Sequence, residues 1–400
     1  MTIASGIFKQ LRYKKETTWG VAPGATGGQL LRRVTSDLNM VKESYESNEI
    51  RSDFQVADMR HGVRSVSGTI NGELSPLTYA DFFAAAMRKN AVAGSSATSL
   101  TITSSASGKT FARSTGSWLT DGFKKGDVVR FTGYTGGNVG MNNQNYRIAT
   151  LTATIITVVE STGMVDASAV SGISCAVTGK KIWVPTTGHT DDSFSIEHYF
   201  ADLVQSELFT GCKANKIDIA MPASGMSTIA VSILGKGVTT DSAAYYTSPS
   251  AETVTKLLTA VSGKLRVGSS DIANVTAASI SIESGMTTAP VAGSNDIGAV
   301  FPGRVRVSGE LSAYFEDVTL RDAFINETEL ALYLYLTTGS EANADFINIV
   351  LPRIKASNAT KDDGEKGLIQ TIPFTALLNT AGGTGLDSEK TTISIQDSAA

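Results

Sequence analysis

Two glycine-containing segments could bind phosphate or a nucleotide, and neither has the spacing that this chemistry needs. Ser107 to Thr110 has the sequence SGKT, the end of a phosphate-binding loop in which lysine and a hydroxyl side chain contact phosphate and magnesium. The first glycine of that motif falls on Thr103, and no helical pattern follows. The glycines between Gly133 and Gly140 suggest a dinucleotide loop, but Asn-rich coil follows them instead of a helix. A flexible surface loop explains them better.

Histidine and acidic side chains gather at two further places where a metal could bind. The first group lies near a predicted linker and strand and comprises His189, Asp191, Asp192, Glu197 and His198. Because two histidines in a linker and a strand need not face one site, we interpret these residues as surface or interface residues. Asp362 to Glu365 match no defined calcium loop, so a hairpin turn explains them. No Ser/His/Asp or Cys/His arrangement is supported, and the sequence predicts no catalytic residue, cofactor or metal site.

Composition narrows the class of protein further. The chain has 400 residues, 42% of them hydrophobic, which is enough for two or three domains. Only 18% are charged, and a surface poor in charge often forms an interface. The net charge of −4 is not that of a tight nucleic-acid binder. Two cysteines, Cys175 and Cys212, favour a reduced compartment. We expect no signal peptide and no membrane insertion, because the longest apolar stretch is only Leu330 to Leu336.

The clearest structural signal is a strand followed by a helix between residues 60 and 87. Apolar or glycine positions alternate with polar ones from Val66 to Leu74, which predicts a half-buried strand. Ser75 stands at a position suited to a helix N-cap and Pro76 at the first helical position. The aromatic and apolar residues from Tyr79 to Met87 recur at helical spacing, so the helix should lie on its own strand.

The same unit recurs 241 residues later, from Gly303 to Phe324. The inward positions of the first strand keep their parity there, which a slip of one residue would destroy. They are Val66, Gly68, Ile70, Gly72 and Leu74 in the first unit and Val307, Gly309, Leu311, Ala313 and Phe315 in the second. A further similarity relates Ile217 to Pro222 with Ile347 to Pro352. The alternative is that short Val-Ser-Gly strands recur by chance in a β-rich chain.

Spacing within the two units indicates an insertion. Val66 and Ile217 are 151 residues apart, but Val307 and Ile347 only 40, so the first unit carries 111 more residues. A folded insert costs little stability when its ends lie close together. We therefore divide the chain as follows: an N-terminal arm, 1–33; repeat 1, 34–90 plus 191–237; an inserted module, 91–190; a linker, 238–262; and repeat 2, 263–400.

Two oppositely charged blocks near the N-terminus suggest self-association. Residues 1–33 have a net charge of +5 and residues 34–59 a net charge of −4. The acidic block includes a long polar loop from about Ser44 to Met59, where an arm or neighbour from another chain could dock. A solvated face and a frayed terminus are the alternative. The candidate contacts between subunits are Lys9, Arg12, Lys14, Lys15, Trp19, Glu43, Glu46, Glu49, Asp53 and Asp58.

The inserted module should be a small closed β unit. Short strands are predicted around 100–103, 127–132, 146–151 and 155–159, separated by a glycine- and asparagine-rich loop. Its aromatic residues Trp118, Tyr134 and Tyr146 make it a candidate for binding carbohydrate or a host surface. Taken together, the patterns predict a mainly β protein with flanking helices, in which two tandem sandwich- or barrel-forming domains enclose an inserted β-barrel-like module.

At these residues the sequence resembles a known family. WGVAPG at 19–24, LRRV at 31–34 and the acidic loop precede VSGTINGELSPLTYADFFAAAM at 66–87 and ELFTGCKANKIDIAMPASGMSTIAVSILGKG at 207–237. This pattern is similar to that of the tail tube proteins of long-tailed bacteriophages. The resemblance covers nearly the whole chain, although its motifs are β patterns rather than a catalytic fingerprint.

The resemblance implies a structural subunit of the virion tail, assembled in the cytoplasm of the bacterial host. Its sheets would join those of neighbours in rings, which stack into a conduit for double-stranded DNA. Two domains per chain imply three chains per ring with apparent six-fold symmetry, and a six-chain ring stays open. Implied partners are a tail-tip initiator, a tape measure and a tail terminator. Since basic side chains retain phosphate, we expect a polar lumen that is neutral to acidic. The alternatives are a tail terminator, a decoration protein or a host-binding or carbohydrate-binding module.

Overall fold

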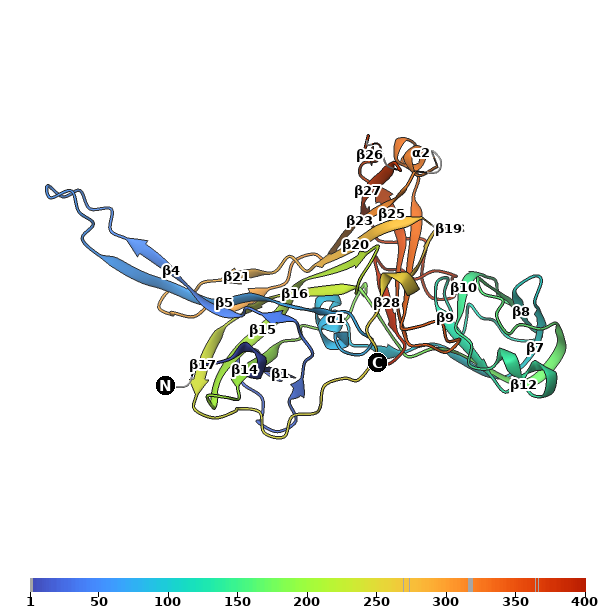
Figure 1. The fold of residues 1–400 in the computed structure, drawn as a ribbon, viewed down its shortest axis with the longest axis horizontal. Helices are drawn as coiled ribbons and strands as arrows, with labels where there is room; N and C mark the ends of the chain where they lie inside the picture. The colour runs from blue at the N-terminus through green and yellow to red at the C-terminus, as the bar shows by residue number, and fades with distance from the viewer. Residues whose placement is uncertain (1–2, 269, 273, 316–318, 364, 366) are drawn as a thin grey trace.

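The computed structural model confirms a mainly β fold (Figure 1). It describes residues 3–400 apart from 269, 273, 316–318, 364 and 366. The described strands form one 20-stranded sheet, a closed six-stranded barrel and a two-stranded hairpin. The barrel lies at one end of an elongated molecule, and a long hairpin projects from the other end (Figure 1).

The predicted central strand is confirmed, whereas the start of its helix is not. β5 (Met59–Glu73) buries Val66 and Ile70, as the alternation of apolar and polar residues requires. α1 (Ala80–Met87) begins later than Pro76 because Leu77 has a φ of 70°, a left-handed conformation that a helix cannot include. The Ser75 hydroxyl instead bonds to the Thr78 hydroxyl at 2.6 Å. α1 packs mainly on β15 (Gln205–Pro222) rather than on β5, which corrects the expected position of the helix.

The strands around α1 form a continuous set with a simple pairing order. β1 (Lys9–Lys15) pairs with β14 (Phe194–Phe200), and β14 pairs with the first half of β15. The second half of β15 pairs with β16 (Thr228–Gly235), and β16 pairs with β5. β5 in turn pairs with β3 (Thr35–Ser36) and β4 (Asn39–Glu46). β17 (Gly237–Asp241) adds to the first half of β15. The expected arm and linker therefore contribute β1 and β17 to this sheet.

A second set of strands has the same pairing order. β18 (Lys264–Val267) pairs with β24 (Leu330–Thr337), and β24 with β25 (Phe346–Ala356). β25 and β26 (Thr360–Lys361) pair with β27 (Ile369–Ala376), β27 with β23 (Arg306–Tyr314), and β23 with β20 (Val275–Glu283). β28 (Ser394–Asp397) adds to the first half of β25, as β17 does to β15.

The register of the two sets also agrees. Val66 lies opposite Gly235 and Met40, and its counterpart Val307 lies opposite Ala376 and Ile282. Each set also has a helix after its central strand, α1 in the first and α2 (Thr319–Ile325) in the second. The side chain of Thr319, which stands 241 residues after Thr78, lies outside the described residues.

The second sequence similarity is wrong by the same criterion. Ile217 pairs with Val231 in β16, whereas Ile347 pairs with Leu336 in β24. The counterpart of Ile347 is Gln205, which pairs with Phe200 in β14. Runs of alternating isoleucine look alike wherever a strand buries one face, so the pattern alone could not fix the register. In β15 the counterparts of β25 and β26 form one unbroken strand.

The corrected register resizes the insertion. Val66 and Phe209 are 143 residues apart, but their counterparts Val307 and Leu351 are only 44 apart, so the first set carries 99 extra residues. Most of them form the closed barrel, whose order around the wall is β10-β11-β8-β7-β12-β9. Its strands are β7 (Ser96–Ser105), β8 (Thr110–Arg113), β9 (Val128–Thr132), β10 (Tyr146–Leu151), β11 (Ile155–Val158) and β12 (Ala167–Val177). The predicted small closed β unit is confirmed.

Short elements complete the chain. The chain between β14 and β15 forms a tight turn, with Val204 in the left-handed region. The remaining strands are β2 (Gln29–Leu30), β6 (Val92–Ala93), β13 (Lys180–Trp183), β19 (Ser270–Ile272), β21 (Thr287–Ala289) and β22 (Ala299–Phe301). The 3-10 helices are Gly6–Phe8, Gly136–Met141 and Ala260–Ser262.

Candidate functional site

The residues that the sequence offered as phosphate, nucleotide or metal ligands lie in separate places, most of them in turns and loops of the fold. The SGKT segment closes the hairpin between β7 and β8, and the loop from Gly133 continues into a short 3-10 helix. Asp362 accepts a hydrogen bond from the Ile369 amide in the hairpin that follows β26, and Gly364 lies outside the described residues. Within the described part of the chain, no three His, Cys, Asp or Glu side chains are placed to hold a metal ion.

Four of the five expected metal-ligand candidates have different partners. Asp191 pairs with Lys213 at 2.7 Å and Asp192 with Lys15 at 2.7 Å. Glu197 is buried and accepts the backbone amides of Tyr245 and Tyr246. The His198 ring bonds to the Ser36 hydroxyl at 2.8 Å, and burial lowers the pKa of His198 below its ordinary value. His189 lies on an exposed loop. These side chains therefore stabilise the sheets of repeat 1.

The basic candidates of the N-terminal segment are likewise engaged within the chain. Arg12 is buried, donates to the Tyr246 carbonyl at 2.9 Å and lies 3.6 Å from Glu197. Lys9 and Lys14 donate to backbone carbonyls, and Lys15 pairs with Asp192. The Trp19 indole donates to the Gly211 carbonyl at 3.1 Å. The structure thus accounts for these five residues by contacts inside one chain.

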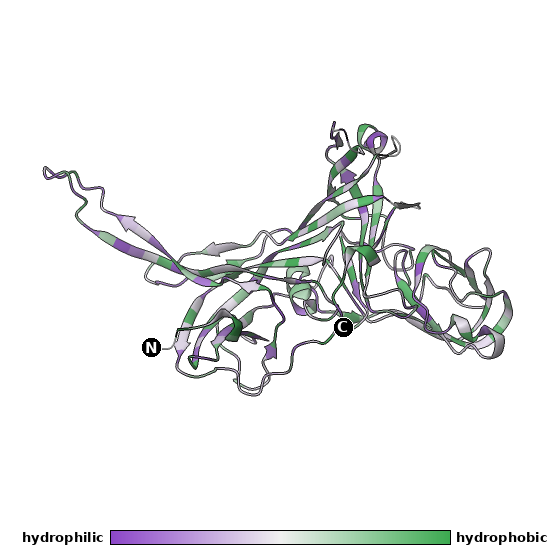
Figure 2. Ribbon diagram, in the orientation of Figure 1, coloured by the Kyte–Doolittle hydropathy of each residue, from purple (hydrophilic) through white to green (hydrophobic). Residues whose placement is uncertain are grey.

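The acidic candidates, in contrast, lie away from the body of the chain. Glu43, Glu46, Glu49, Asp53 and Asp58 are all exposed on the projecting hairpin formed by β4 and the start of β5. We call residues 39–63 the free arm. It extends away from the body of the molecule (Figure 1), and Figure 2 shows hydrophilic and hydrophobic residues alternating along it. Two ion pairs within the free arm join near neighbours, Arg51 to Asp53 and Arg60 to Asp58.

The two strand sets are joined edge to edge. The second half of β15 has β16 on one side and β20 on the other, with Ile217 opposite Ile282 and Met221 opposite Ala278. The sheet therefore continues without interruption from repeat 1 into repeat 2. The inward side chains of both strands are buried in one hydrophobic core. Sequence analysis missed this joint because β-strand patterns do not reveal which edges meet.

At each end of this continuous sheet a corresponding edge is open. Among the described residues, β20 is paired on both sides, but its counterpart β4 pairs only with β5. In the same part of the chain, the second half of β15 is paired on both sides, but its counterpart β26 pairs only with β27. Open edges of this kind are templates for another strand. Within the described residues, the chain has one joined pair of edges and one unjoined pair of the same type.

The continuous sheet also has one polar face. Apolar residues point into the core, while the opposite face of β5, β16, β15, β20, β23 and β27 is rich in Ser and Thr. When β5 is counted from Ser65 onward, this face carries four acidic and two basic residues, which is a net charge of −2. They are Glu73, Asp218, Glu283, Glu310, Lys216 and Arg306. Lys216 is further neutralised by Asp218 at 2.9 Å.

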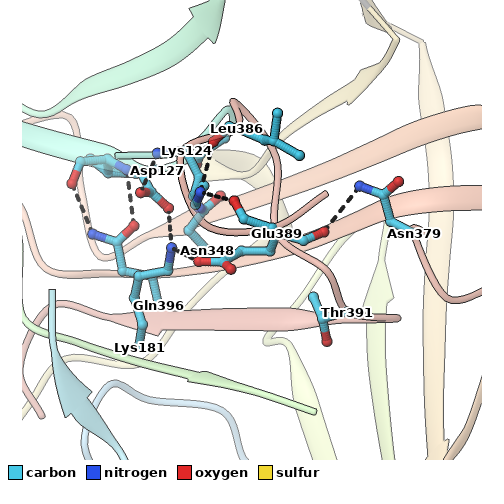
Figure 3. A network of polar contacts seen from close by, with 12 residues as sticks. Lys124, Asp127, Lys181, Asn348, Asn379, Leu386, Glu389, Thr391 and Gln396 are labelled. Carbon is cyan, nitrogen blue, oxygen red and sulfur yellow. Dashed lines mark hydrogen bonds and ion pairs between the residues drawn. The ribbon is translucent and has the colours of Figure 1, made fainter. Parts of the chain in front are cut away.

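The barrel is fixed to repeat 2 by a network of polar contacts (Figure 3). The Lys124 ammonium donates to the carbonyls of Gly383 and Leu386, each at 2.7 Å. The Gln396 side chain bonds both backbone groups of Val128, at 2.8 and 2.9 Å. The Asn348 amide donates to the Gly126 carbonyl at 2.7 Å. The inserted module, although it interrupts repeat 1, is therefore docked on the strands of repeat 2.

A buried ion pair lies at the centre of this network. Lys181 in β13 lies 2.6 Å from Asp127 of the barrel and 3.3 Å from Glu389 of repeat 2. Burial alone would lower the pKa of Lys181, but the carboxylates of Asp127 and Glu389 raise it above its ordinary value. Lys181 therefore remains charged and connects the two modules. Removing the Lys181 ammonium would leave the Asp127 carboxylate buried without its cation.

The aromatic residues of the barrel are not available to a ligand. Trp118, Tyr134 and Tyr146 are all buried in the barrel core, where Trp118 packs edge-on against Phe123. Stacking on a sugar needs an exposed ring face, so these three residues cannot provide it in this structure. The expectation that they make the barrel a carbohydrate-binding module has lost its basis.

Complementary open edges, a polar sheet face and a rigidly docked barrel define a β-rich structural protein. A family model for the phage tail tube protein matches residues 9–376. The chain therefore belongs to the phage tail tube protein family, whose members are structural components of the virion tail. No curated protein matches this chain. Among the described residues, no helix is long and apolar enough to cross a membrane.

Proposed function

We propose that this chain is the repeating subunit of a tail tube, in which rings of subunits stack into a hollow conduit that carries double-stranded DNA toward the host. The observation that supports this most strongly is the pairing of β15 with β20. It joins two similar β units side by side and leaves a matching edge open at each end. Closing a ring of such units would pair every open edge.

Three chains per ring fit this arrangement best. If each repeat, completed by β1 and β17 or by their counterparts β18 and β28, is one tube domain, three chains supply six domains. Joints within a chain would then alternate with joints between chains. A six-chain ring would contain twelve such domains. Native mass spectrometry of isolated rings distinguishes the two, because their masses differ twofold.

The polar face of the continuous sheet is proposed to line the channel. Its net charge of −2 and its Ser and Thr side chains would not hold phosphate groups. Replacing Ser281 and Ser308 by Arg should leave tube formation intact but slow DNA release, since each cation on a phosphate adds to retention. The matched control replaces the same residues by Asn. Equal release from both variants would show that this face does not line the channel.

The proposed tube has further partners and a place of assembly. Its ends would contact a tail-tip initiator and a tail terminator, and a tape measure protein would occupy it before DNA does. Assembly would take place in the cytoplasm of the bacterial host, with the finished tail in the virion. These partners follow from the family and not from any contact in this chain.

Electron microscopy of the purified full-length protein tests the proposal. Negative-stain images at rising protein concentration should show stacked rings of constant diameter. A single ring that never stacks would instead indicate a tail terminator, and a persistent monomer that adds to capsids would indicate a decoration protein. A monomer that binds glycans on an array of the full chain would support the host-binding alternative. Each of these three results would contradict a tube subunit.

A further inference from the structure

We propose that the free arm of one chain docks on repeat 2 of a neighbouring chain. The start of β4, at the base of this arm, would pair with the open edge of β26. This inference rests on the proposed ring, and it specifies which residues meet and in which register. The partner is a second molecule of this same protein. The joint that already exists inside the chain is a template for the joint between chains.

The internal joint has a defined geometry. Beyond the pairing of β20 with β15, the hairpin that follows β20 lies across repeat 1. The amide of Arg64 donates to the Asn295 carbonyl at 2.8 Å, and its guanidinium pairs with Asp296. The Lys213 ammonium donates to the Val300 carbonyl at 3.3 Å. We call residues 284–305 the docked arm. They belong to repeat 2 and correspond to residues 42–64, which include most of the free arm.

In repeat 1 the docked arm lies on a surface that includes Lys213. The corresponding surface of repeat 2 is not covered by an arm among the described residues. Lys213 pairs with Leu234 in β16, and its counterpart Lys355 pairs with Thr375 in β27. Both lysines also have a nearby carboxylate, Asp191 for Lys213 and Glu327 for Lys355. The docked arm leaves the Lys213 side chain only 4% exposed, whereas the Lys355 side chain is 37% exposed. The difference marks the place where a second arm is missing.

In repeat 1, β4 and the free arm are less buried than β20 and the docked arm, to which they correspond. Ile282 of β20 is buried between β15 and β23, but its counterpart Met40 in β4 is only half-buried. The docked arm buries Ile297 and Val300. The free arm instead exposes Ile50, Phe54 and Val56, with Ile50 and Phe54 at 103% and 98% exposure. Such exposed apolar side chains on a projecting hairpin indicate a binding surface.

The template also fixes the register. Lys216 and Asp218 lie opposite Glu283 and Ser281 across the internal joint. Their counterparts place Asn358 of one chain opposite Val41 of the next, and Thr360 opposite Asn39. The pairing should stop at Lys361, because one step further Asp362 would face Asp37 and two carboxylates would repel each other. The expected contact is therefore residues 38–41 with 358–361.

Charge supports the same orientation. The free arm carries the acidic candidates Glu43, Glu46, Glu49, Asp53 and Asp58. On the acceptor side, Arg304 and Arg306 flank Val305, the counterpart of Arg64, and both are exposed. The template brings the tip of the arm, near Asp53, to these two arginines. Opposite charges on the two surfaces would steer the correct edges together.

Paired cysteines test the register directly. In tubes of the full-length protein, Val41→Cys combined with Asn358→Cys should form a disulfide between chains on mild oxidation. Directly opposite residues of an antiparallel pair lie within disulfide range, about 4.5–5.5 Å between Cα atoms. The matched control combines Val41→Cys with Ala359→Cys, whose side chain points to the other face. The native Cys175 and Cys212 are buried and should not interfere.

The outcomes separate this inference from the proposed function. Linked chains in the first variant, with little linkage in the control, support the register, and a covalently closed trimer would be the end product. Normal tubes in which the first variant links no better than the control would overturn the inference and leave the tube function standing. If the unmodified protein forms no tubes, both fail together.

Charge reversal provides a second measurement if the cysteine variants do not assemble. Replacing Arg304 and Arg306 by Glu should slow tube growth about tenfold at low salt, since charged rims govern association rates. Replacing Asp53 and Asp58 by Lys in the same chain should restore growth. Far-UV circular dichroism of the monomers should be unchanged, because all four side chains are exposed. Equal growth rates in all variants would contradict the proposed contact.

Discussion

Repeat 1 and repeat 2 have the same strand order, yet each completes a different part of the same joint. Repeat 1 offers an occupied acceptor edge, β15, and repeat 2 an empty one, β26. Repeat 2 offers a docked arm and repeat 1 a free one. Where the joint is made, Lys213 and Ile282 are buried, and where it is missing, Lys355 and Met40 are not. Two similar sequences in one chain thus show the same surface with and without its partner.

A second difference concerns the outer edge of each repeat. β13, the strand that follows the inserted barrel, pairs with β28 in repeat 2. Among the described residues, β17, which is the counterpart of β28, pairs with β15 alone. The barrel then covers the tyrosine face of β24, where Val128 packs with Tyr335 and Phe346. An insertion in one repeat therefore protects an edge of the other. It makes the two repeats a single body rather than two domains on a linker.

Proline substitutions at corresponding positions should separate the two edges most strongly. Ile217→Pro breaks the joined edge and removes a core side chain, which should destabilise the chain by about 3 kcal/mol or more from the backbone alone. Ala359→Pro alters the corresponding position of the open edge. It should change the free energy of unfolding by less than about 1 kcal/mol and yet prevent tube growth. Chemical denaturation and electron microscopy of both variants measure the two effects.

Equal destabilisation by the two prolines would contradict the comparison. So would normal tubes from Ala359→Pro, because an edge that tolerates proline is not paired with another strand. A substitution on the polar face beside the open edge, Thr375→Ala, serves as a control that should affect neither property.

The second prediction tests the docking of the barrel. Lys181→Met should lower the free energy of unfolding by about 3–5 kcal/mol, since it leaves Asp127 buried without its cation. Lys125→Met is the matched control, because Lys125 pairs with Asp387 at a site where both side chains are about one-third exposed. Its effect should be about 1 kcal/mol or less. Urea denaturation followed by tryptophan fluorescence compares them, and equal losses would show that the network does not hold the barrel.

Much of this fold could be predicted from the sequence because alternation reports directly on burial. The strand containing Val66 and Ile70, its counterpart around Val307, and the small closed β module all follow from side-chain periodicity and turn residues. The register of Ile217 could not be predicted, since every strand with one buried face shows the same alternation. The start of α1 was missed because the left-handed conformation of Leu77 leaves no trace in residue type.

For a related reason, the sequence could not show which of the candidate contact residues are buried and which are exposed. Charge patterning drew attention to both N-terminal blocks, but it does not distinguish Arg12, which is buried beside Glu197, from Glu49, which is exposed on the free arm. The equivalence of Lys213 and Lys355 could not be predicted either. Lys213 lies in the middle of β15 and Lys355 near the end of β25, and only the pairing register shows that the two positions correspond.

The smallest expected effect is the sharpest test of the comparison. Lys213→Met leaves the Val300 carbonyl without its donor, which should lower the free energy of unfolding by about 1–2 kcal/mol. Lys355→Met should change it by less than about 0.5 kcal/mol in the monomer, because the exposed pair with Glu327 contributes little. Thermal unfolding of dilute monomers measures both.

Assembly should reduce that difference. If the free arm of a neighbour covers Lys355 as the docked arm covers Lys213, Lys355→Met should lower the dissociation temperature of tubes although it leaves the monomer unchanged. Lys390→Met is a suitable control, because Lys390 is an exposed lysine of repeat 2 in a loop away from the edge of β26. Tubes of Lys355→Met that dissociate at the unmodified temperature would mean that Lys355 stays exposed in the tube. The resemblance between the two repeats would then end at their strand order and would not extend to how their edges are joined.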